Sequence, residues 1–242
     1  MIEIKNLSKS YDNFLVLDDI NLEIKEGEFI SILGSFGCGK TTLMKIIGGL
    51  INNYKGTVKI NGLNPVEILK KRKIGFCFQK ANLLPWRNII KNICLPLELS
   101  GEKKFTEKSN KLLKIIGLES IATKKIWEVS GGTQQLTSIL RSLALDPAIL
   151  LLDEPFSSID EISRDMLHCK LIKMHQKTKK TIIMITHSIN EAVFLSDRII
   201  VLSKNPAKIK KILKINFPKR DESIKETEKY VLYTNQIRRL LK

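Results

Sequence analysis

The chain contains 242 residues, 43% of them hydrophobic, and carries a formal net charge of +16 at pH 7. This length and apolar content can bury a full core, which excludes a disordered chain and favours one large domain or one domain with an inserted lobe. The apolar stretches are far shorter than the roughly 20 residues that a membrane-crossing helix needs, and the N-terminal residues lack the apolar core of a signal peptide. We therefore expect a protein that is made and kept in the cytoplasm.

The positive charge is spread along the whole chain rather than gathered at one site. Its one tight cluster, residues 70–73, has no aromatic side chains interleaved with it, and no nucleic acid is expected as a partner. Solvated faces, a compositional bias, or attraction to an anionic membrane surface account for the charge at least as well. The four cysteines are far apart and form no C-x-x-C pair, which predicts reduced thiols rather than a disulfide framework or a zinc site.

The N-terminal part of the chain has the pattern of several strands. Residues 2–7 and 20–24 alternate apolar and polar side chains, which is typical of half-buried antiparallel strands. Residues 29–33 are almost entirely apolar and predict a buried strand. Residues 56–60 predict a further strand, which ends in a turn at Asn61-Gly62.

A phosphate-binding motif follows the predicted buried strand. Residues 34–41 fit G-x-x-x-x-G-K-S/T and lead into residues 43–47, whose apolar side chains have helical spacing. Glycines let consecutive backbone N–H groups converge on an anion, with the positive end of the following helix behind them. Lys40 adds a cation for the β- and γ-phosphates, and Thr41 adds a hydroxyl for Mg²⁺. The motif and its flanks predict that the chain binds a nucleotide.

From about residue 79 to residue 147 the apolar side chains have helical periods, which indicates an inserted helical lobe. Thr106 is the predicted N-cap of one helix, and Gly117 is the residue at which it stops. A second helix is predicted after Ser130-Gly131-Gly132, because apolar residues recur from Leu136 onward with the spacing of one helix face.

Strand patterns return in residues 149–152, 181–185 and 199–202, with helical spacers between them, and this alternation predicts a parallel sheet. The first of these strands ends in Asp153 and Glu154. Asp153 would reach Mg²⁺ through water, and Glu154 would orient or deprotonate an attacking water, whereas the alternative is an acidic strand end that merely faces solvent.

Two further features lie in the last third of the chain. His168 and His175 are one heptad apart on a predicted helix, and we expect both on its surface rather than at a metal. Residues 208–242 are basic and are predicted to end in a helix at about residues 231–241.

Ser130-Gly131-Gly132 opens a helix shortly before the acidic strand end. Because this motif accompanies the phosphate-binding loop, nearly the whole chain resembles an ATP-binding cassette (ABC) ATPase. The resemblance implies an α/β fold: a P-loop NTPase core with a mixed sheet, an antiparallel β subdomain and an inserted helical subdomain. It implies an ATPase domain over residues 1–220, with the helical subdomain at about 80–147, and a C-terminal helical extension over residues 221–242.

The resemblance also implies a role for each matching residue. Glu154, His187 and Gln79 would be catalytic, with His187 as the switch histidine and Gln79 as the Q-loop glutamine that senses Mg²⁺ and water. The residues implied for the nucleotide are Tyr11 as the ring on adenine, Gly34, Ser35, Phe36, Gly37, Cys38, Gly39, Lys40, Thr41 and Thr42 in the loop, and Ser130, Gly131, Gly132 and Asp160 facing the partner subunit. Those implied for Mg²⁺ are Thr41, Gln79 and Asp153. An ordinary loop amide and an ordinary packed ring remain the alternatives for Gln79 and Tyr11.

By the same resemblance, the chain would be the ATP-hydrolysing subunit of an importer, using ATP and Mg²⁺ at a head-to-tail dimer interface. Residues 82–87, 95–98, 205–209 and 217–220 look like the nitrate, sulfonate, taurine and bicarbonate branch. The implied partners are a second ATPase subunit, with a homodimer expected, transmembrane permease subunits and, indirectly, an extracytoplasmic solute-binding protein. The implied location is the cytoplasmic face of the cell membrane, as a peripheral subunit.

Three departures from this family bear on catalysis. Phe36 stands where a small polar residue is usual, and Gln134 and Leu136 stand where the branch usually carries arginine. The alternative is therefore a catalytically weakened, nucleotide-gated regulatory or binding module of the same fold. A third reading, an ATPase that works on nucleic acid, is favoured only by the net charge.

Overall fold

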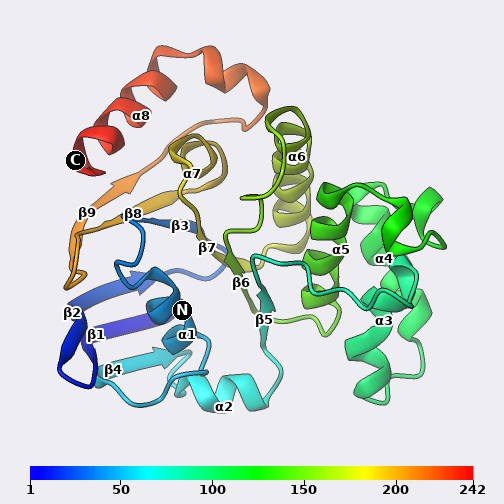
Figure 1. The fold of residues 1–242 in the computed structure, drawn as a ribbon, viewed down its shortest axis with the longest axis horizontal. Helices are drawn as coiled ribbons and strands as arrows, with labels where there is room; N and C mark the ends of the chain where they lie inside the picture. The colour runs from blue at the N-terminus through cyan, green and yellow to red at the C-terminus, as the bar shows by residue number, and fades with distance from the viewer. Residues whose placement is uncertain (242) are drawn as a thin grey trace.

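The computed structural model describes residues 1–241, apart from the side chain of Ile162. Two sheets lie against each other, and helices cover the outer face of the larger one (Figure 1). The smaller sheet has the order β2-β1-β4, and the larger has the order β5-β6-β7-β3-β8-β9. This architecture confirms the expected α/β class with a mixed sheet and an antiparallel β subdomain.

The smaller sheet is antiparallel and consists of β1 (Ile2–Tyr11), β2 (Phe14–Ile24) and β4 (Lys55–Ile60). Alternating side chains of β1, among them Ile2 and Ile4, are buried on the face toward the larger sheet. The strands predicted here are confirmed, but β1 and β2 run further than the alternating residues, because they pair as far as Tyr11 and Phe14.

The larger sheet contains five parallel strands, and β9 is antiparallel at its edge. In chain order its strands are β3 (Phe29–Leu33), β5 (Ile74–Cys77), β6 (Ile149–Asp153), β7 (Thr181–Ile185), β8 (Arg198–Leu202) and β9 (Ile209–Lys214). Both faces are buried. Along β3, Phe29 and Leu33 enter the apolar cluster beneath the outer helices, whereas Ile30 and Ile32 enter the cluster shared with the smaller sheet.

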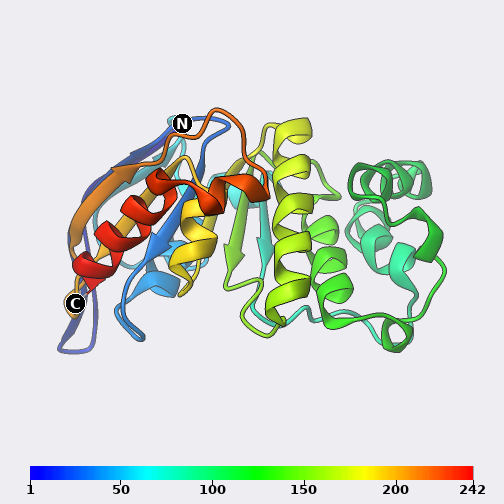
Figure 2. The ribbon, with the colours of Figure 1, turned by 90° about the horizontal axis from the view of Figure 1, so that it is seen from above.

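The remaining elements are helices. In chain order they are α1 (Lys40–Ile47), α2 (Pro65–Lys70), α3 (Ile89–Leu99), α4 (Phe105–Ile116), α5 (Gly131–Leu143), α6 (Glu161–Thr178), α7 (Ile189–Leu195) and α8 (Glu228–Leu241), with short 3₁₀ turns at Glu119–Ile121, Ile126–Glu128 and Glu222–Glu226. Helices α3, α4 and α5 are inserted between β5 and β6. Figure 2 shows α3 and α4 at one end of the molecule and α8 toward the other.

Two local predictions need correction. The N-cap predicted at Thr106 is wrong: the N-cap is Lys104, two residues earlier, and no side chain caps the helix. The stop at Gly117 is confirmed, because this residue has a φ of 67° and ends α4 in the left-handed conformation. The C-terminal helix begins at Glu228 rather than near residue 231. Lys242, the end of the predicted extension, lies outside the described residues.

The expectation that His168 and His175 lie on a helix surface is also wrong. His168 is only 3% exposed and lies between the rings of Phe156 and Phe194, and His175 is half-buried with Nε2 3.0 Å from the carbonyl of Gly27. Helix α6 is covered on this side by α7 and the β2–β3 connection, contacts that spacing along one helix does not reveal. In the described residues, no helix is both long enough and apolar enough to span a bilayer.

Candidate functional site

The phosphate-binding motif forms the turn between β3 and α1. Gly39 has a φ of 109°, and a Cβ at this position would lie 2.8 Å from Val16 Cγ1, so only glycine fits without rearrangement. Lys40 begins α1 and is 5% exposed, and its Nζ donates hydrogen bonds to the carbonyls of Gly34 (3.0 Å) and Ser35 (2.9 Å). The loop thus curls around its own lysine, and the N-terminus of α1 points into the space that the loop encloses.

A cavity of about 340 Å³ opens beside this loop. Its lining consists of Val16, Phe36, Gly37, Cys38, Gly39, Lys40, Thr41, Thr42, Glu154 and His187. The structure therefore brings together the loop, the acidic strand end and the histidine, which are far apart in sequence. Val16 was not among the predicted residues, because no motif marks it.

Thr41 lines this cavity and contacts Asp153, which lies outside the lining. Thr41 Oγ1 donates to the Asp153 carboxylate, 3.3 Å from Oδ2 and 3.5 Å from Oδ1. Burial, and secondarily the charge of Glu154, raise the pKa of Asp153 above its ordinary value. A hydroxyl and a carboxylate beside a phosphate-binding loop are oxygen ligands of the kind that Mg²⁺ prefers, and a cation there would relieve the desolvated carboxylate.

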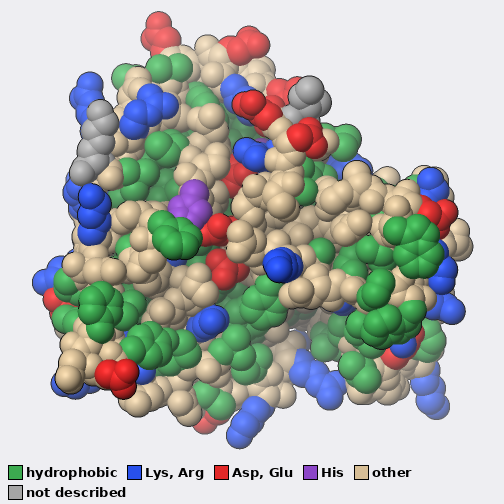
Figure 3. All heavy atoms as spheres, viewed as in Figure 1, with side chains coloured by type: hydrophobic (Ala, Val, Ile, Leu, Met, Phe, Trp, Pro, Cys, Tyr) green, Lys and Arg blue, Asp and Glu red, His purple; other side chains and the backbone are tan. Residues whose placement is uncertain are grey.

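Glu154 and His187 form the opposite wall. Glu154 follows β6 with a φ of 48°, a conformation that costs a non-glycine residue about 1 kcal/mol. Its N–H donates to the carbonyl of Ile185 (3.0 Å), which aligns the ends of β6 and β7, and its Oε1 lies 2.6 Å from His187 Nε2. In Figure 3, a histidine is visible at the surface of this face beside acidic and hydrophobic side chains. A carboxylate held in this way can position a water and accept its proton.

Phe36 covers the other side of the histidine. The rings of Phe36 and His187 are stacked, with centroids 6.3 Å apart and an interplanar angle of 27°. The Phe36 side chain is nevertheless 94% exposed, which is unusual for a phenylalanine.

Gln79 contacts Ser157 rather than the Asp153 carboxylate. Its Nε2 donates to Ser157 Oγ (3.2 Å), and Ser157 Oγ donates to the carbonyl of Glu154 (3.1 Å). The glutamine is therefore connected with the end of β6 through one serine.

Helix α5 holds the segment that carries Gln79. Gln135 Nε2 donates to the carbonyl of Phe78 (3.2 Å), and Arg141 donates to the carbonyls of Ala81 (2.8 Å) and Asn82 (2.9 Å). These three hydrogen bonds were not predicted. One sequence feature could have indicated a polar contact of this helix: Gln135, Ser138 and Arg141 recur every three residues among many apolar side chains.

Ser130, Gly131 and Gly132 lie away from the phosphate-binding loop of their own chain. Ser130 caps α5 by accepting a hydrogen bond from the N–H of Thr133 (3.3 Å). Cβ atoms built on Gly131 and Gly132 would contact Ile159 and Leu167, so this helix start lies against residues 159–167. None of the three lines the 340 Å³ cavity.

Asp160 and Tyr11 also lie outside the lining of this cavity. Asp160 caps α6, with Oδ1 accepting from the N–H of Ser163 (2.8 Å). Tyr11, at the end of β1, is 44% exposed and lies beneath the ammonium group of Lys9, 4.7 Å from its ring centroid.

Comparison with known proteins identifies the family. The model of the ABC transporter family matches residues 17–157. The chain belongs to the ABC transporter family. An uncharacterized ABC transporter ATP-binding protein of Methanocaldococcus jannaschii is 40% identical over 248 aligned residues, which cover 100% of this chain and 91% of that protein. The taurine import ATP-binding protein TauB of Escherichia coli is 39% identical, over 91% of this chain and 86% of TauB.

Solved ABC structures agree with this family and with its chemistry. A dimeric ATP-binding cassette in a post-hydrolysis state, bound to ADP and Pi, has a TM-score of 0.76 and 33% identity, over 90% of this chain and all of that one. A second dimeric structure of the same cassette gives a TM-score of 0.75. The chain is therefore an ABC ATPase.

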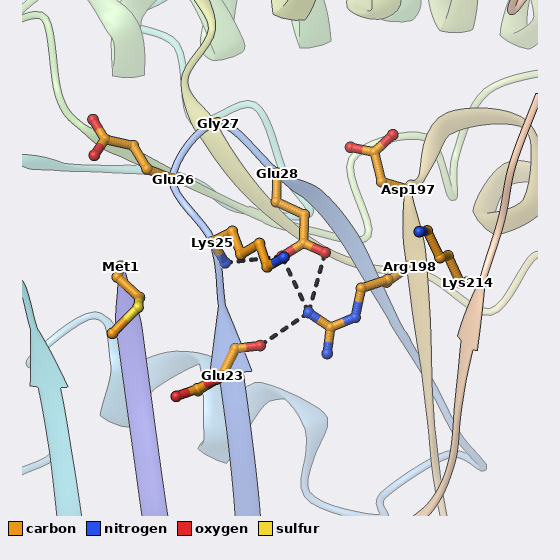
Figure 4. A pocket seen from close by; sticks show the side chains of 9 residues that line it. All are labelled: Met1, Glu23, Lys25, Glu26, Gly27, Glu28, Asp197, Arg198 and Lys214. Atoms are coloured by element: carbon orange, nitrogen blue, oxygen red, sulfur yellow. Dashed lines mark hydrogen bonds and ion pairs between the residues drawn. The ribbon is translucent and has the colours of Figure 1, made fainter. Parts of the chain in front are cut away.

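A larger cavity, of about 560 Å³, lies at the other end of β3 and is lined mainly by charged side chains (Figure 4). Arg198 projects into it, but its NH1 already bonds both oxygens of Glu28 (3.1 Å each) and the carbonyl of Glu23 (2.9 Å). This cavity is remote from the phosphate-binding loop, and the bonds of Arg198 join β8 to β2 and to the residue that precedes β3.

Proposed function

We propose that this chain is the ATP-hydrolysing subunit of an importer, and that two copies complete the ATP sites between them. The single observation that carries the proposal is the cavity in which Lys40, Thr41, Glu154 and His187 face one another. Its size and its basic and acidic groups suit a magnesium-bound triphosphate.

The position of α5 supports a head-to-tail dimer. The N-terminus of a helix stabilises anions through its free N–H groups and its dipole, yet the start of α5 lies outside the phosphate cavity of its own chain. A second copy facing the first would place Ser130, Gly131 and Gly132 over the terminal phosphate, with Asp160 nearby. Tyr11 would contact adenine at the rim.

In this mechanism, the backbone of residues 34–41 and the ammonium group of Lys40 bind the phosphates. Thr41 and Asp153 would hold Mg²⁺, and Gln79 would respond to the presence of the ion. The bound ion would offset charge that develops on the phosphates. Glu154 orients the attacking water and accepts its proton, and His187 fixes the Glu154 carboxylate through the 2.6 Å contact.

The importer assignment rests on the relatives and on the segments noted above. TauB is named for taurine import, and we propose uptake of a related small solute through separate permease subunits, with a solute-binding protein outside the cell. The chain would lie at the cytoplasmic face of the membrane. We further propose that residues 1–220 form the ATPase domain, with residues 80–147 as its helical subdomain and residues 221–242 as an extension.

Glu154→Gln tests the chemical role. The amide keeps the shape of the side chain but cannot accept the proton, so we expect the hydrolysis rate to fall by about 10²- to 10⁴-fold while the affinity for Mg-ATP stays within about threefold. Steady-state turnover and equilibrium titration with a fluorescent ATP analogue measure the two quantities. As a matched control, Glu161→Gln at the first position of α6 should leave both unchanged. Wild-type turnover by Glu154→Gln would show that Glu154 does not accept the proton of the attacking water.

The exposed Phe36 ring favours a second candidate, a catalytically weakened nucleotide-gated module. A ring stacked on His187 occupies space at the mouth of the cavity and hinders the close approach of another copy. In that case the chain would bind Mg-ATP but turn it over slowly, and removal of the ring would restore the rate.

A further inference from the structure

The helix that follows the switch histidine is short and largely buried, and it packs against β3, α6 and α8. Helix α7 contains seven residues, Ile189–Leu195, and begins two residues after His187. Seven residues provide fewer than two helical turns, which are unstable unless packing or capping holds them. The placement of His187 therefore depends on what fixes α7.

The first turn of α7 is connected directly to the histidine loop. The buried carboxylate of Glu191 accepts a hydrogen bond from Thr186 Oγ1 (2.5 Å), and the same hydroxyl oxygen accepts from the N–H of Ser188 (3.0 Å). The residues on both sides of His187 are thereby tied to one side chain of α7. A shift of α7 would move these bonds and, with them, the imidazole that contacts Glu154.

The C-terminal segment of the chain holds α7 at both ends. Near its start, the hydroxyl of Tyr230 donates to the carbonyl of Asn190 (3.1 Å), and the Tyr230 ring is 6% exposed. At its end, Arg220 donates to the carbonyls of Phe194 (2.9 Å) and Ser196 (2.6 Å). Arg220 thus satisfies carbonyls that a helix end leaves free. Figure 2 shows α8 and the preceding segment beside α7.

A third contact joins this segment to α6. Lys225 Nζ lies 2.5 Å from Asp165 Oδ2 and 5.3 Å from the centroid of the Phe194 ring, so it connects the segment with both α6 and α7. On the inner side of α7, Arg164 Nε and His168 Nε2 lie 3.5 and 3.7 Å from Glu191 Oε1. Helix α7 is therefore enclosed between α6 and residues 217–230.

We propose that residues 217–230, which we name the brace, position His187 for ATP hydrolysis: Arg220 and Tyr230 fix α7, and α7 fixes the histidine loop through Glu191. This inference rests on the proposed role of His187. It assigns a part in the reaction to residues that contact neither the nucleotide cavity nor the phosphate-binding loop.

Tyr230→Phe tests the brace with the smallest change, because it removes one hydroxyl and keeps the ring in place. We expect kcat to fall about fivefold, the equivalent of one ordinary hydrogen bond, with the KM for Mg-ATP within about twofold. Amide hydrogen exchange over residues 186–195 should become faster. The control is Tyr233→Phe, which alters a half-buried ring of the same helix whose hydroxyl has no hydrogen-bond partner in the described chain. This control should change neither quantity.

A double-mutant cycle with His187→Ala decides whether the brace acts through the histidine. We expect Tyr230→Phe to cause no further loss of single-turnover rate in the His187→Ala background. An equal loss in both backgrounds would overturn the inference, as would wild-type kcat in folded Tyr230→Phe and Arg220→Gln variants. If His187→Ala itself hydrolyses ATP at the wild-type rate, the proposed role of His187 fails and the inference fails with it. A slow His187→Ala beside a fully active Tyr230→Phe overturns the inference alone.

Discussion

Phe36 is a residue of the phosphate-binding loop whose large apolar side chain faces solvent. It is almost fully exposed, yet it stacks on the one histidine that contacts Glu154. An aromatic pair of this kind contributes about 0.5–1.5 kcal/mol beyond the area that it buries. That free energy holds the ring over His187 at the mouth of the cavity, where it would hinder the close approach of a second copy.

Phe36→Ser is therefore expected to raise kcat by about threefold to tenfold, which corresponds to loss of the stacking free energy. ATP turnover at saturating nucleotide checks this value. Phe14→Ser removes another exposed ring, on β2 and outside the lining of the cavity, and should leave kcat unchanged. An unchanged or lower kcat in Phe36→Ser would show that the ring does not limit the reaction.

Residues in motifs of fixed spacing were predictable, and residues that act through long-range contacts were not. Lys40, Thr41 and Glu154 follow from local patterns, and the structure places them around one cavity. Arg141 was missed because its function is to bond the carbonyls of residues some 60 positions earlier. Nothing in the composition of α5 indicates that particular partner.

At the scale of elements, we expect His175, where α6 meets the connection before β3, to make the stability of the fold depend on pH. His175 of α6 bonds the carbonyl of Gly27, but burial outweighs this bond and lowers the pKa of His175 below 6.5. As the pH falls below that value, the unfolded chain takes up a proton that the folded chain resists. The free energy of unfolding therefore decreases with falling pH in this range.

His175→Gln should flatten this dependence, because the glutamine amide can donate to the same carbonyl and does not titrate. Chemical denaturation at pH 8 and at pH 5 gives the two free energies of unfolding. We expect the loss between these pH values to be smaller in His175→Gln than in the wild type. An identical loss in the two proteins would assign the acid sensitivity to other groups.

Helices and buried strands with clear periodicity were predicted correctly, and elements fixed by their partners were not. Strand β9 was missed because Ile209–Lys214 has no alternation of apolar and polar side chains, and only its pairing with β8 defines it. The start of α4 was misplaced because this helix begins without a capping side chain, so the rule that favoured Thr106 did not apply.

At the scale of the whole molecule, the two halves of the proposed ATP site lie on separate surfaces of one chain. The phosphate-binding loop and Glu154 form one half, and the start of α5 forms the other. Within a symmetric dimer, each composite site would then take one half from each copy.

Mixing two inactive variants tests this arrangement. Lys40→Ala damages the first half, and Gly131→Asp damages the second at a position with room for a side chain, since a Cβ there meets only Ile159 at 3.9 Å. In a mixed dimer one site keeps both halves intact, so an equimolar mixture should recover up to about a quarter of wild-type turnover. Lys40→Ala mixed with Glu154→Gln should recover none, because both lesions lie in the same half. Equal outcomes in the two mixtures would contradict shared sites.

Periodicity indicated a parallel sheet, but not the strand order β5-β6-β7-β3-β8-β9. That order depends on where each crossover returns, and the helical insertion between β5 and β6 separates two neighbouring strands by more than 70 residues. The family resemblance, rather than the spacing of apolar residues, supplied the combination of a mixed sheet with a helical insertion.

The edge position of β9 has a consequence for the protein at high concentration. Its outer backbone groups face no further strand in the described chain, and such a row can recruit another sheet. Exposed Lys210, Lys211 and Lys214 lie along it. Two such edges would repel each other on approach, so the abundant lysine of this region protects the protein against fibrous aggregation in a crowded cell.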